Sequence, residues 1–179
     1  EDNSEKKAAA DALLQAHLVL EQRVEERTRE LQDAHQRMQV VIDSSTLAIY
    51  TQDQQGRVLS WNTAAEKMFN LLRQETLDNP SIFSQRLETP ELQALREQAF
   101  EGRKVVNTEL QLDLPGGQAL ELSLNIVALH GQAGQAYGVL TMASDISERK
   151  ANERKVAFMA YHDALTGLPN RRMLLDRLE

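Results

Sequence analysis

Residues 56–69 read Gly56-Arg57-Val58-Leu59-Ser60-Trp61-Asn62-Thr63-Ala64-Ala65-Glu66-Lys67-Met68-Phe69, and this stretch decides the fold. Its first part is the second arm of a hairpin, because the turn signal Asp53-Gln54-Gln55-Gly56 separates it from a strand expected at 47–51. Its second part is helical, since Asn62 is a good N-cap and apolar residues follow at helical spacing. The stretch therefore predicts a strand that turns directly into a helix.

Three longer strands are predicted in the second half of the chain. Apolar and polar residues alternate over 107–114 and again over 120–126, which is the two-residue period of a strand with one buried face. The turn Pro115-Gly116-Gly117 separates these strands, and a third follows at 137–144. The clearest helix in the middle is expected at 91–101. Short connections make the strands antiparallel, so the predicted class is α+β, with helices on one face of the sheet.

These passages, in this order, resemble a PAS domain, which implies a five-stranded antiparallel sheet. The likeness is carried by Ile42-Asp43-Ser44-Ser45, by the stretch 56–69, by the Pro-Gly-Gly turn and by residues 138–147. The last of these ends in Asp145-Ile146-Ser147, which matches the exit motif of the family and is implied to relay the signal. Asp145 or Ser147 is also expected to cap the helix that follows. The predicted organisation is a signalling helix at 1–42, the PAS domain at 43–146, a linker helix at 147–162 and the start of a further domain at 163–179.

The resemblance implies a space between sheet and helices that can hold a flavin, a haem or a small metabolite, although many such domains hold nothing. Trp61 is expected to pack in the core rather than to stack on a flavin ring. The inward positions of the later strands are all aliphatic and form either a filled core or an apolar pocket. They are Leu110, Leu112, Leu120, Leu122, Leu124 and Ile126. A small apolar ligand therefore stays open, and its identity is not readable from the sequence.

No cofactor is predicted. The absence of cysteine excludes cysteinyl-flavin photochemistry and disulfides. Haem needs an axial ligand, usually histidine, but the histidines are expected in the first helix, in a loop and beyond the linker helix. They are His17, His35, His130 and His162. The sequence also has no glycine-rich phosphate loop and no cluster with the spacing of metal ligands.

The first 42 residues predict one long helix. Heptad a and d positions counted from Ala10 to Val41 are mostly apolar, which favours a parallel homodimeric coiled coil. His17, Arg27 and Ala34 interrupt this seam and predict a dimer of modest stability. The alternative is a solvent-exposed helix that does not dimerise and is ordered only by the neighbouring parts of the protein. Residues 20–31 also resemble signalling helices that join membrane or periplasmic sensors to cytoplasmic domains.

That likeness predicts the cytoplasmic part of a membrane-anchored bacterial receptor, with membrane contact only through a sensor outside this sequence. No apolar run approaches the length of a membrane span. The net charge of −7 disfavours nucleic acid as a partner. The content of 41% apolar and 26% charged residues is that of a globular protein.

The run Asp163-Ala164-Leu165-Thr166-Gly167-Leu168-Pro169-Asn170-Arg171 resembles the entry signature of a GGDEF (diguanylate cyclase) domain and fills each of its fixed positions. By this resemblance Asn170 and Glu179 recognise the guanine base of GTP, although the family often has aspartate at the second position. The catalytic turn is not in this sequence, so no enzymatic activity is expected of the chain itself. GTP and Mg²⁺ belong only to a full-length cyclase. A histidine kinase is disfavoured, because its phospho-acceptor helix has a His-Glu-x-x-(Thr/Asn)-Pro pattern. Here His162 leads instead into Leu-Thr-Gly-Leu-Pro.

The expected function is a dimeric sensory or relay module that controls a diguanylate cyclase. Two alternatives stay open. One is a passive dimerisation scaffold that only raises the local concentration of cyclase domains. The other is a regulator of a degenerate, GTP-binding GGDEF domain coupled to a phosphodiesterase.

Overall fold

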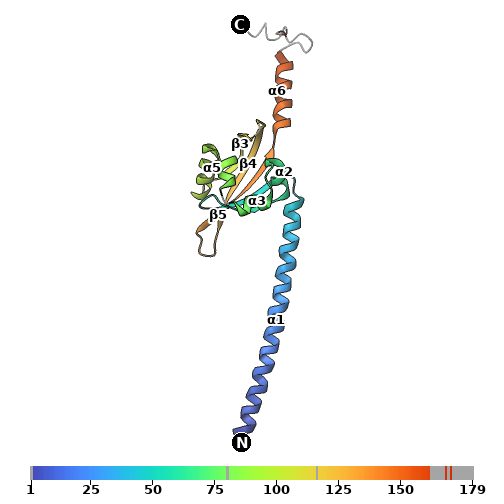
Figure 1. The fold of residues 1–179 in the computed structure, drawn as a ribbon, viewed down its shortest axis with the longest axis vertical. Coiled ribbons are helices and arrows are strands. Elements are labelled where there is room, and N and C mark those ends of the chain that lie inside the picture. The colour runs from blue at the N-terminus through green and yellow to red at the C-terminus, as the bar shows by residue number, and fades with distance from the viewer. Residues whose placement is uncertain (1, 80, 116, 162–167, 169, 171–179) are drawn as a thin grey trace. The chain divides into compact units, whose positions relative to one another are not determined.

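The computed structural model describes residues 2–79, 81–115, 117–161, 168 and 170. It separates into two compact units, Glu1–Ser44 and Ser45–Glu179. The first unit is a single helix, and the second contains the sheet, its covering helices and the exit helix (Figure 1).

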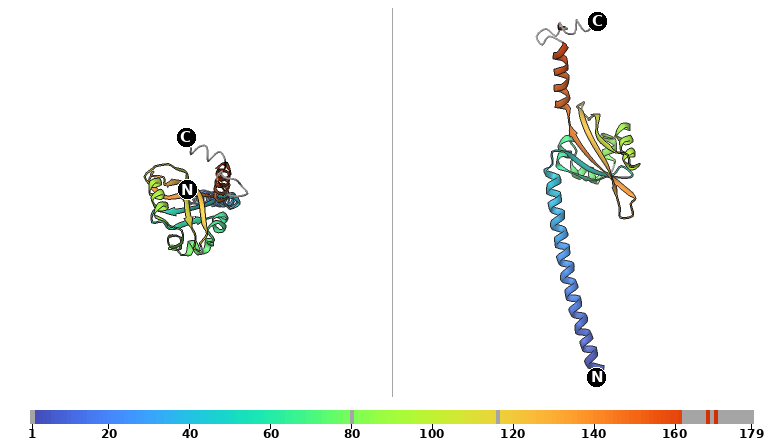
Figure 2. Two further views of the ribbon diagram at one scale, coloured as in Figure 1. Left: turned by 90° about the horizontal axis from the view of Figure 1, so that it is seen from above. Right: turned by 180° about the vertical axis from the view of Figure 1, so that it is seen from behind.

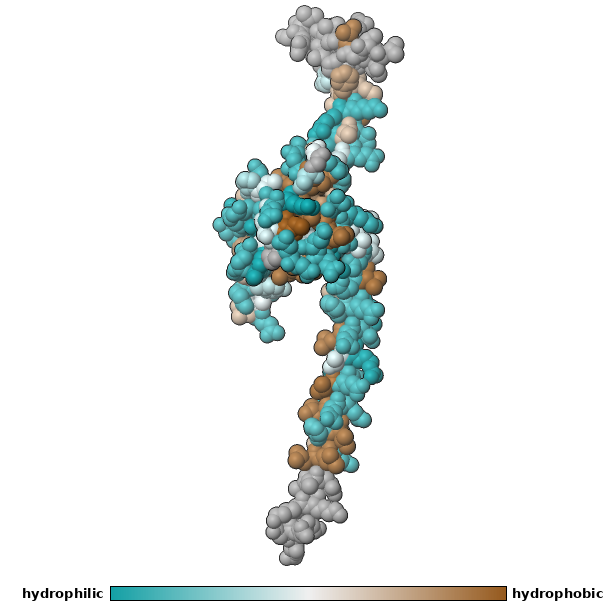
Figure 3. Space-filling view, viewed as in Figure 1, coloured by the Kyte–Doolittle hydropathy of each residue, from teal (hydrophilic) through white to brown (hydrophobic). Residues whose placement is uncertain are grey.

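The first unit is helix α1 (Asp2–Ser44), which confirms the long helix predicted from the sequence and extends it past residue 42. Its side chains are described from residue 13 onward and are mostly exposed. Arg29 and Glu25 form the expected i,i+4 ion pair at 2.9 Å. The exposed apolar side chains of the predicted seam are Leu13, Leu20, Val24, Leu31, Met38 and Val41 (Figure 3). Such a stripe is stable in water only when another surface buries it, and the coiled coil stays a prediction.

The second unit is built on a five-stranded sheet in the order β2-β1-β5-β4-β3, with antiparallel neighbours throughout. The strands are β1 (Ala48–Asp53), β2 (Val58–Trp61), β3 (Val105–Asp113), β4 (Ala119–His130) and β5 (Ala136–Asp145). This arrangement confirms the predicted fold class. His130, which the sequence analysis placed in a loop, is the last residue of β4, because the ladder between β4 and β5 continues to the pair His130–Ala136.

Four short helices lie against one face of this sheet, as the views in Figures 1 and 2 show. They are α2 (Thr63–Phe69), α3 (Arg73–Asp78), α4 (Ile82–Arg86) and α5 (Pro90–Phe100). The exit helix α6 (Ser147–Tyr161) follows β5. The core between sheet and helices contains an aromatic group whose ring centroids lie 5.1 to 6.2 Å apart. Its members are Tyr50, Trp61, Phe69 and Phe83. Rings at these separations add a little attraction to the area that they bury.

Asn62 holds the junction between β2 and α2, as its capping pattern predicts. Its side-chain oxygen accepts hydrogen bonds from the N–H groups of Ala65 and Ile49, both at 2.9 Å. Its amide nitrogen donates to the carbonyl of Leu47 at 2.9 Å. One buried side chain therefore caps α2 and fixes the start of β1 at the same time.

A bulge near the start of β3 is a feature that the sequence did not predict. The register with β4 shifts between Val105 and Thr108, and Asn107 has φ 49°. The Asn107 N–H donates to the side-chain oxygen of Asn125 at 2.9 Å instead of to a strand carbonyl. Asparagine tolerates this left-handed conformation better than most residues. The strand therefore begins earlier than expected, at Val105.

Asn62→Ala is expected to destabilise the second unit by about 3 kcal/mol, because it removes a helix cap and leaves buried backbone groups without partners. Denaturant unfolding followed by circular dichroism measures this. Asn62→Asp is the matched control, since it keeps both accepted bonds and replaces the donated bond by an unfavourable contact of two oxygens at Leu47. We expect it to fall between wild type and Asn62→Ala, and equal stability of all three proteins would contradict the role of Asn62.

Candidate functional site

The predicted inward positions on β3 and β4 do face the core. Leu112, Leu120, Leu122, Leu124 and Ile126 are buried, and Leu110 is partly buried against them. The space that remains between these side chains and the helices has a volume of about 10 Å³, which is about that of one water-sized probe. It is lined by Tyr50, Phe69, Phe83, Leu87, Leu92, Leu110, Leu112, Leu122 and Leu124. In this conformation the apolar side chains fill the space where a ligand would lie.

Trp61 belongs to the packed core and does not line this cavity. Its ring is fully buried, and its indole N–H donates to the carbonyl of Leu71 at 3.0 Å. That carbonyl belongs to the connection between α2 and α3. Trp61 therefore joins the end of β2 to the helical layer, which is the packing role expected from the sequence.

Tyr50 gives the cavity its polar group. Its ring contacts those of Trp61, Phe69 and Phe83, and its hydroxyl is hydrogen-bonded to the side chain of Thr141 on β5. Burial raises the pKa of Tyr50 far above its usual range, and the hydrogen bond with Thr141 only partly opposes this. The phenol is therefore neutral at physiological pH.

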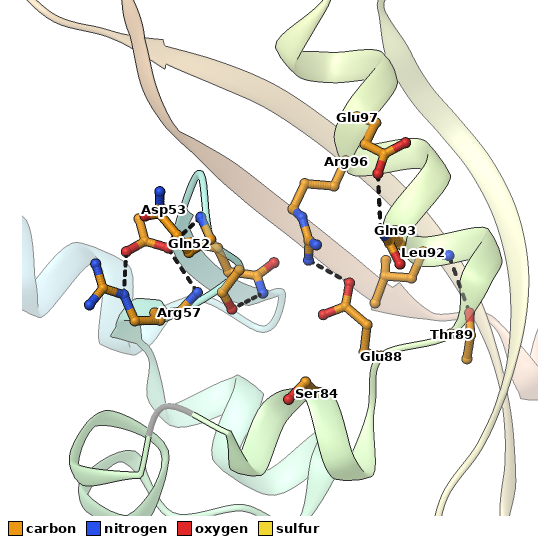
Figure 4. A network of polar contacts seen from close by, with 12 residues as sticks. Gln52, Asp53, Arg57, Ser84, Glu88, Thr89, Leu92, Gln93, Arg96 and Glu97 are labelled. Atoms are coloured by element: carbon orange, nitrogen blue, oxygen red, sulfur yellow. Dashed lines mark hydrogen bonds and ion pairs between the residues drawn. The ribbon is translucent and has the colours of Figure 1, made fainter.

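Polar side chains border the apolar core where the β1–β2 hairpin approaches α5 (Figure 4). Arg96 of α5 pairs with Glu88, and the two side chains are only 12% and 14% exposed. On the hairpin, the Gln52 amide donates to the carbonyl of Gly56 at 2.9 Å. Burial acts to raise the pKa of Asp53, but the hydrogen bonds from Arg57 outweigh it and lower the pKa overall. Sequence reasoning missed the pair of Glu88 with Arg96, because a spacing of eight residues matches no local pattern.

The exit motif lies where β5 leads into α6. The Asp145 side chain accepts a hydrogen bond from the Ser147 N–H at 2.8 Å. The Ile146 N–H donates to the carbonyl of Glu121 at 2.8 Å, and the Ser147 hydroxyl accepts from the Glu121 N–H at 3.0 Å. Asp145, one of the two residues expected to cap α6, therefore bonds its first turn, and the hydroxyl of the other, Ser147, bonds β4 instead.

Ion pairs add a second connection between α6 and the sheet. Glu109 on β3 pairs with Arg149 at 2.9 Å and also with Lys150. The Glu121 carboxylate pairs with Arg154. Hydrogen bonds from Lys150 and Arg149 lower the pKa of Glu109. The exit helix is thus held at its N-terminal half by two acidic side chains on the outer face of the sheet.

The second half of α6 carries exposed apolar side chains. Val156 and Met159, the predicted seam positions, are 63% and 44% exposed. Asn170, implied to recognise guanine, donates from its side-chain amide to the carbonyl of Ala160 at 3.0 Å, and its backbone N–H donates to the carbonyl of Tyr161. In this chain Asn170 therefore caps the end of α6. Glu179, also implied to recognise guanine, and His162 lie outside the described residues.

Within the part of the chain that the structure describes, no group of His, Cys, Asp or Glu side chains has the arrangement of a metal site. Among the same residues, no helix combines the length and the apolar character needed to cross a membrane. What the described residues do form is a connection between the core and the exit helix. A packed core is joined to an exit helix through neighbouring residues of β4.

Comparisons with known proteins agree with this geometry. A family model described as PAS fold matches residues 42–151. The crystal structure of the PAS domain of a protein from Colwellia psychrerythraea has a TM-score of 0.55 and 21% identity, and covers 65% of this chain and 99% of that one. At this level of identity, the similarity to the Colwellia structure concerns the fold alone.

Three curated relatives are signalling proteins. The probable diguanylate cyclase DgcE of Escherichia coli (strain K12) is 24% identical over 139 residues, which are 76% of this chain and 13% of that protein. The signaling protein YkoW of Bacillus subtilis (strain 168) is 26% identical over 149 residues, 83% of this chain and 18% of that protein. The signal transduction histidine-protein kinase AtoS of E. coli is 26% identical over 127 residues, 66% of this chain and 19% of that protein. The chain spans less than a fifth of each relative.

Glu109→Gln is expected to loosen the first turns of α6, because the neutral amide no longer pairs with Arg149 and Lys150. Hydrogen exchange of the α6 amides at neutral pH measures this, and exchange should become faster than in wild type. The depressed pKa of Glu109 gives the same sign with acid: its contribution is complete above the ordinary carboxyl pKa and is lost as the pH falls through the lowered value.

Glu153→Gln is the matched control for this experiment. Glu153 pairs with the same Arg149 at 2.7 Å but lies within α6, so its loss leaves the contacts with the sheet intact. Faster exchange in both variants to the same extent would show that helix propensity, and not attachment to β3, governs the first turns.

Proposed function

This chain belongs to the PAS fold family, and on that premise we propose that it is a dimeric sensory and relay module that controls a C-terminal diguanylate cyclase in its parent protein. The observation that carries the proposal is the triple contact of Glu121 with the exit segment. Its N–H, its carbonyl and its carboxylate bind Ser147, Ile146 and Arg154. A change in the core therefore has a direct route to α6.

The choice of output domain rests on the C-terminal motif. Residues 163–171 resemble the entry of a GGDEF domain, and DgcE is a probable diguanylate cyclase. AtoS is a histidine kinase, so likeness in the PAS region alone does not select one output. In the proposed parent, two GTP-loaded domains face each other and a metal-assisted 3′-hydroxyl attack on the α-phosphate forms cyclic di-GMP. The module itself binds neither GTP nor Mg²⁺ in this proposal.

The proposed control variable is the relative placement of the two cyclase domains. A seam of exposed apolar residues on α1 supports a second copy of the chain as the partner. Residues 147–161 contain neither glycine nor proline, so α6 is suited to act as a stiff connector. Rotation or tilt of α6 in one protomer would then change how the two domains meet. A passive scaffold needs only their proximity.

Residues 1–179 are expected to form a homodimer through α1. Sedimentation velocity should give the mass of two chains, and deletion of residues 1–40 should shift the protein toward the monomer. Leu20→Glu together with Leu31→Glu should act like the deletion, because both side chains lie on the seam. Val19→Glu is the control off the seam, and its side chain is exposed in α1 as well. An unchanged dimer after the deletion would place the interface on the second unit.

The full-length protein distinguishes relay from scaffold. One residue inserted after Lys150 turns the following helix by about 100°, whereas seven residues return it close to the original face. We expect strong loss of diguanylate cyclase activity with one inserted residue, a smaller loss with four, which leave the helix about 40° from its original face, and recovery with seven. Equal activity across the series would support the scaffold. GTP binding without cyclic di-GMP formation in the unmodified protein would instead indicate the degenerate domain.

A further inference from the structure

The ion pair between Glu88 and Arg96 is unusual for its position at the border of the apolar core. Glu88 lies in the connection between α4 and α5, and its Oε1 is 2.5 Å from Nη1 of Arg96 on α5 (Figure 4). Both side chains are more than four-fifths buried. Removing two charges from water costs about as much as their attraction returns, so an apolar pair of similar size would serve stability as well. Stability alone therefore does not account for charges at this position.

Arg96 is only half used in this pair. A guanidinium is a planar fork that can bind one carboxylate with two parallel hydrogen bonds. In the described part of the chain, a single contact joins it to Glu88. The guanidinium also lies against the hairpin turn: a Cβ at Gly56 would lie 3.2 Å from Nη1 of Arg96 and 3.3 Å from Nη2. Arg96 is thus held in place between α5 and the hairpin, and its pair with Glu88 uses only one nitrogen of the fork.

Neighbours of the Glu88–Arg96 pair line the apolar cavity. Leu87 and Leu92, on either side of Glu88 in sequence, line the cavity together with Tyr50. Tyr50 also lies close enough for the charges of Glu88 and Arg96 to affect its pKa in opposite directions. Leu92 and Arg96 are four residues apart in α5 and so share a face of that helix. A side chain or ligand that binds Arg96 therefore has the apolar side chains of Leu87 and Leu92 near its other end.

The size of Glu88 defines what fits. Beyond its Cα, a glutamate side chain is the equivalent of a propionate ion. When Glu88 turns toward solvent, it vacates a propionate-sized volume in front of Arg96 and next to the apolar cavity. A carboxylate that enters replaces one negative charge by another, so Arg96 is not left buried without a counter-ion.

We propose that Arg96 anchors a binding site for small aliphatic monocarboxylates and that Glu88 occupies this site as an internal competitor in the unliganded protein. The ligand carboxylate binds the guanidinium fork, and its alkyl end lies toward Leu87 and Leu92. Release of Glu88 frees the connection between α4 and α5, which carries part of the cavity wall. The inference deepens the proposed sensory function and rests on it only for the consequence of binding.

Propionate is the probe for the test, with residues 1–179 labelled with ¹⁵N-glycine. The Gly56 amide reports on Arg96, since that glycine lies against the guanidinium. We expect a saturable shift of the Gly56 resonance with sodium propionate. Propionamide and sodium chloride should cause none, because the first lacks the charge and the second lacks the alkyl group. The melting temperature should rise with propionate as mass action requires.

Variants of the pair make the test specific. Glu88→Gln keeps the shape and removes the competing charge, so propionate should bind at least about tenfold more tightly. Arg96→Gln should abolish the shift. Because that change leaves Glu88 buried without a partner, the double variant Glu88→Gln, Arg96→Gln serves as the folded neutral control, and it should not bind either.

Three results would overturn the proposal. One is a wild-type protein without a saturable shift, even if Glu88→Gln binds, because the pair would then be structural only. Another is an equal response to propionamide, which would make the site apolar and not anionic. The third is binding that survives in the double variant. None of these results touches the insertion series after Lys150, so failure here is distinguishable from failure of the proposed function.

Discussion

The strict alternation of side chains along β4 is the constraint on which the rest of the second unit depends. Leu120 and Leu122 point into the core, and Glu121 between them points to the outer face, where α6 begins. Successive residues of a strand cannot move independently, because the pleat and the ladder fix their directions. Displacement of the core leucines must therefore displace Glu121, and with it the atoms that hold Ile146, Ser147 and Arg154. The core leucines and the residue that holds the exit segment are therefore direct neighbours on β4.

The joint between β4 and α6 has a firm part and an adjustable part. The bond from the Ile146 N–H to the Glu121 carbonyl continues the pattern of a strand pair, and the Ser147 hydroxyl accepts from the Glu121 N–H beside it. Ile146 itself is buried. The ion pairs of Glu109 with Arg149 and Lys150 lie on the surface, where solvent and salt weaken them. A helix held in this way keeps its starting point while its tilt responds to small energies. Such an attachment suits a relay better than a fully rigid connection or a flexible linker would.

The sequence predicted the features that neighbouring residues determine. It did not predict the contacts between residues that are distant in sequence. Asn62 was readable as a cap, because an asparagine between a strand and a helical pattern has few other uses there. Its bonds to Ile49 and Leu47 were not readable, since they depend on how β1 and β2 pair. Ser147 was read as a cap for the same local reason, but its partner Glu121 lies 26 residues away. The Glu88–Arg96 pair could not be predicted from the sequence, because it depends on how the tertiary structure buries the two side chains.

Two helices of this chain carry apolar side chains that the described chain does not cover. On α1 they include the apolar residues of the predicted heptad seam, and on α6 they include Val156 and Met159. An isolated helix of 15 residues is marginal in water, and only the first half of α6 is held by the sheet. Asn170 caps this second half, and a surface that buries its exposed apolar side chains would stabilise it further. If that surface is the same helix of a second copy, the partner that completes α6 is also the partner whose placement α6 controls. The equilibrium that forms the second half of α6 would then also set the relative placement of the two output domains. Both the core and the partner chain can shift that equilibrium.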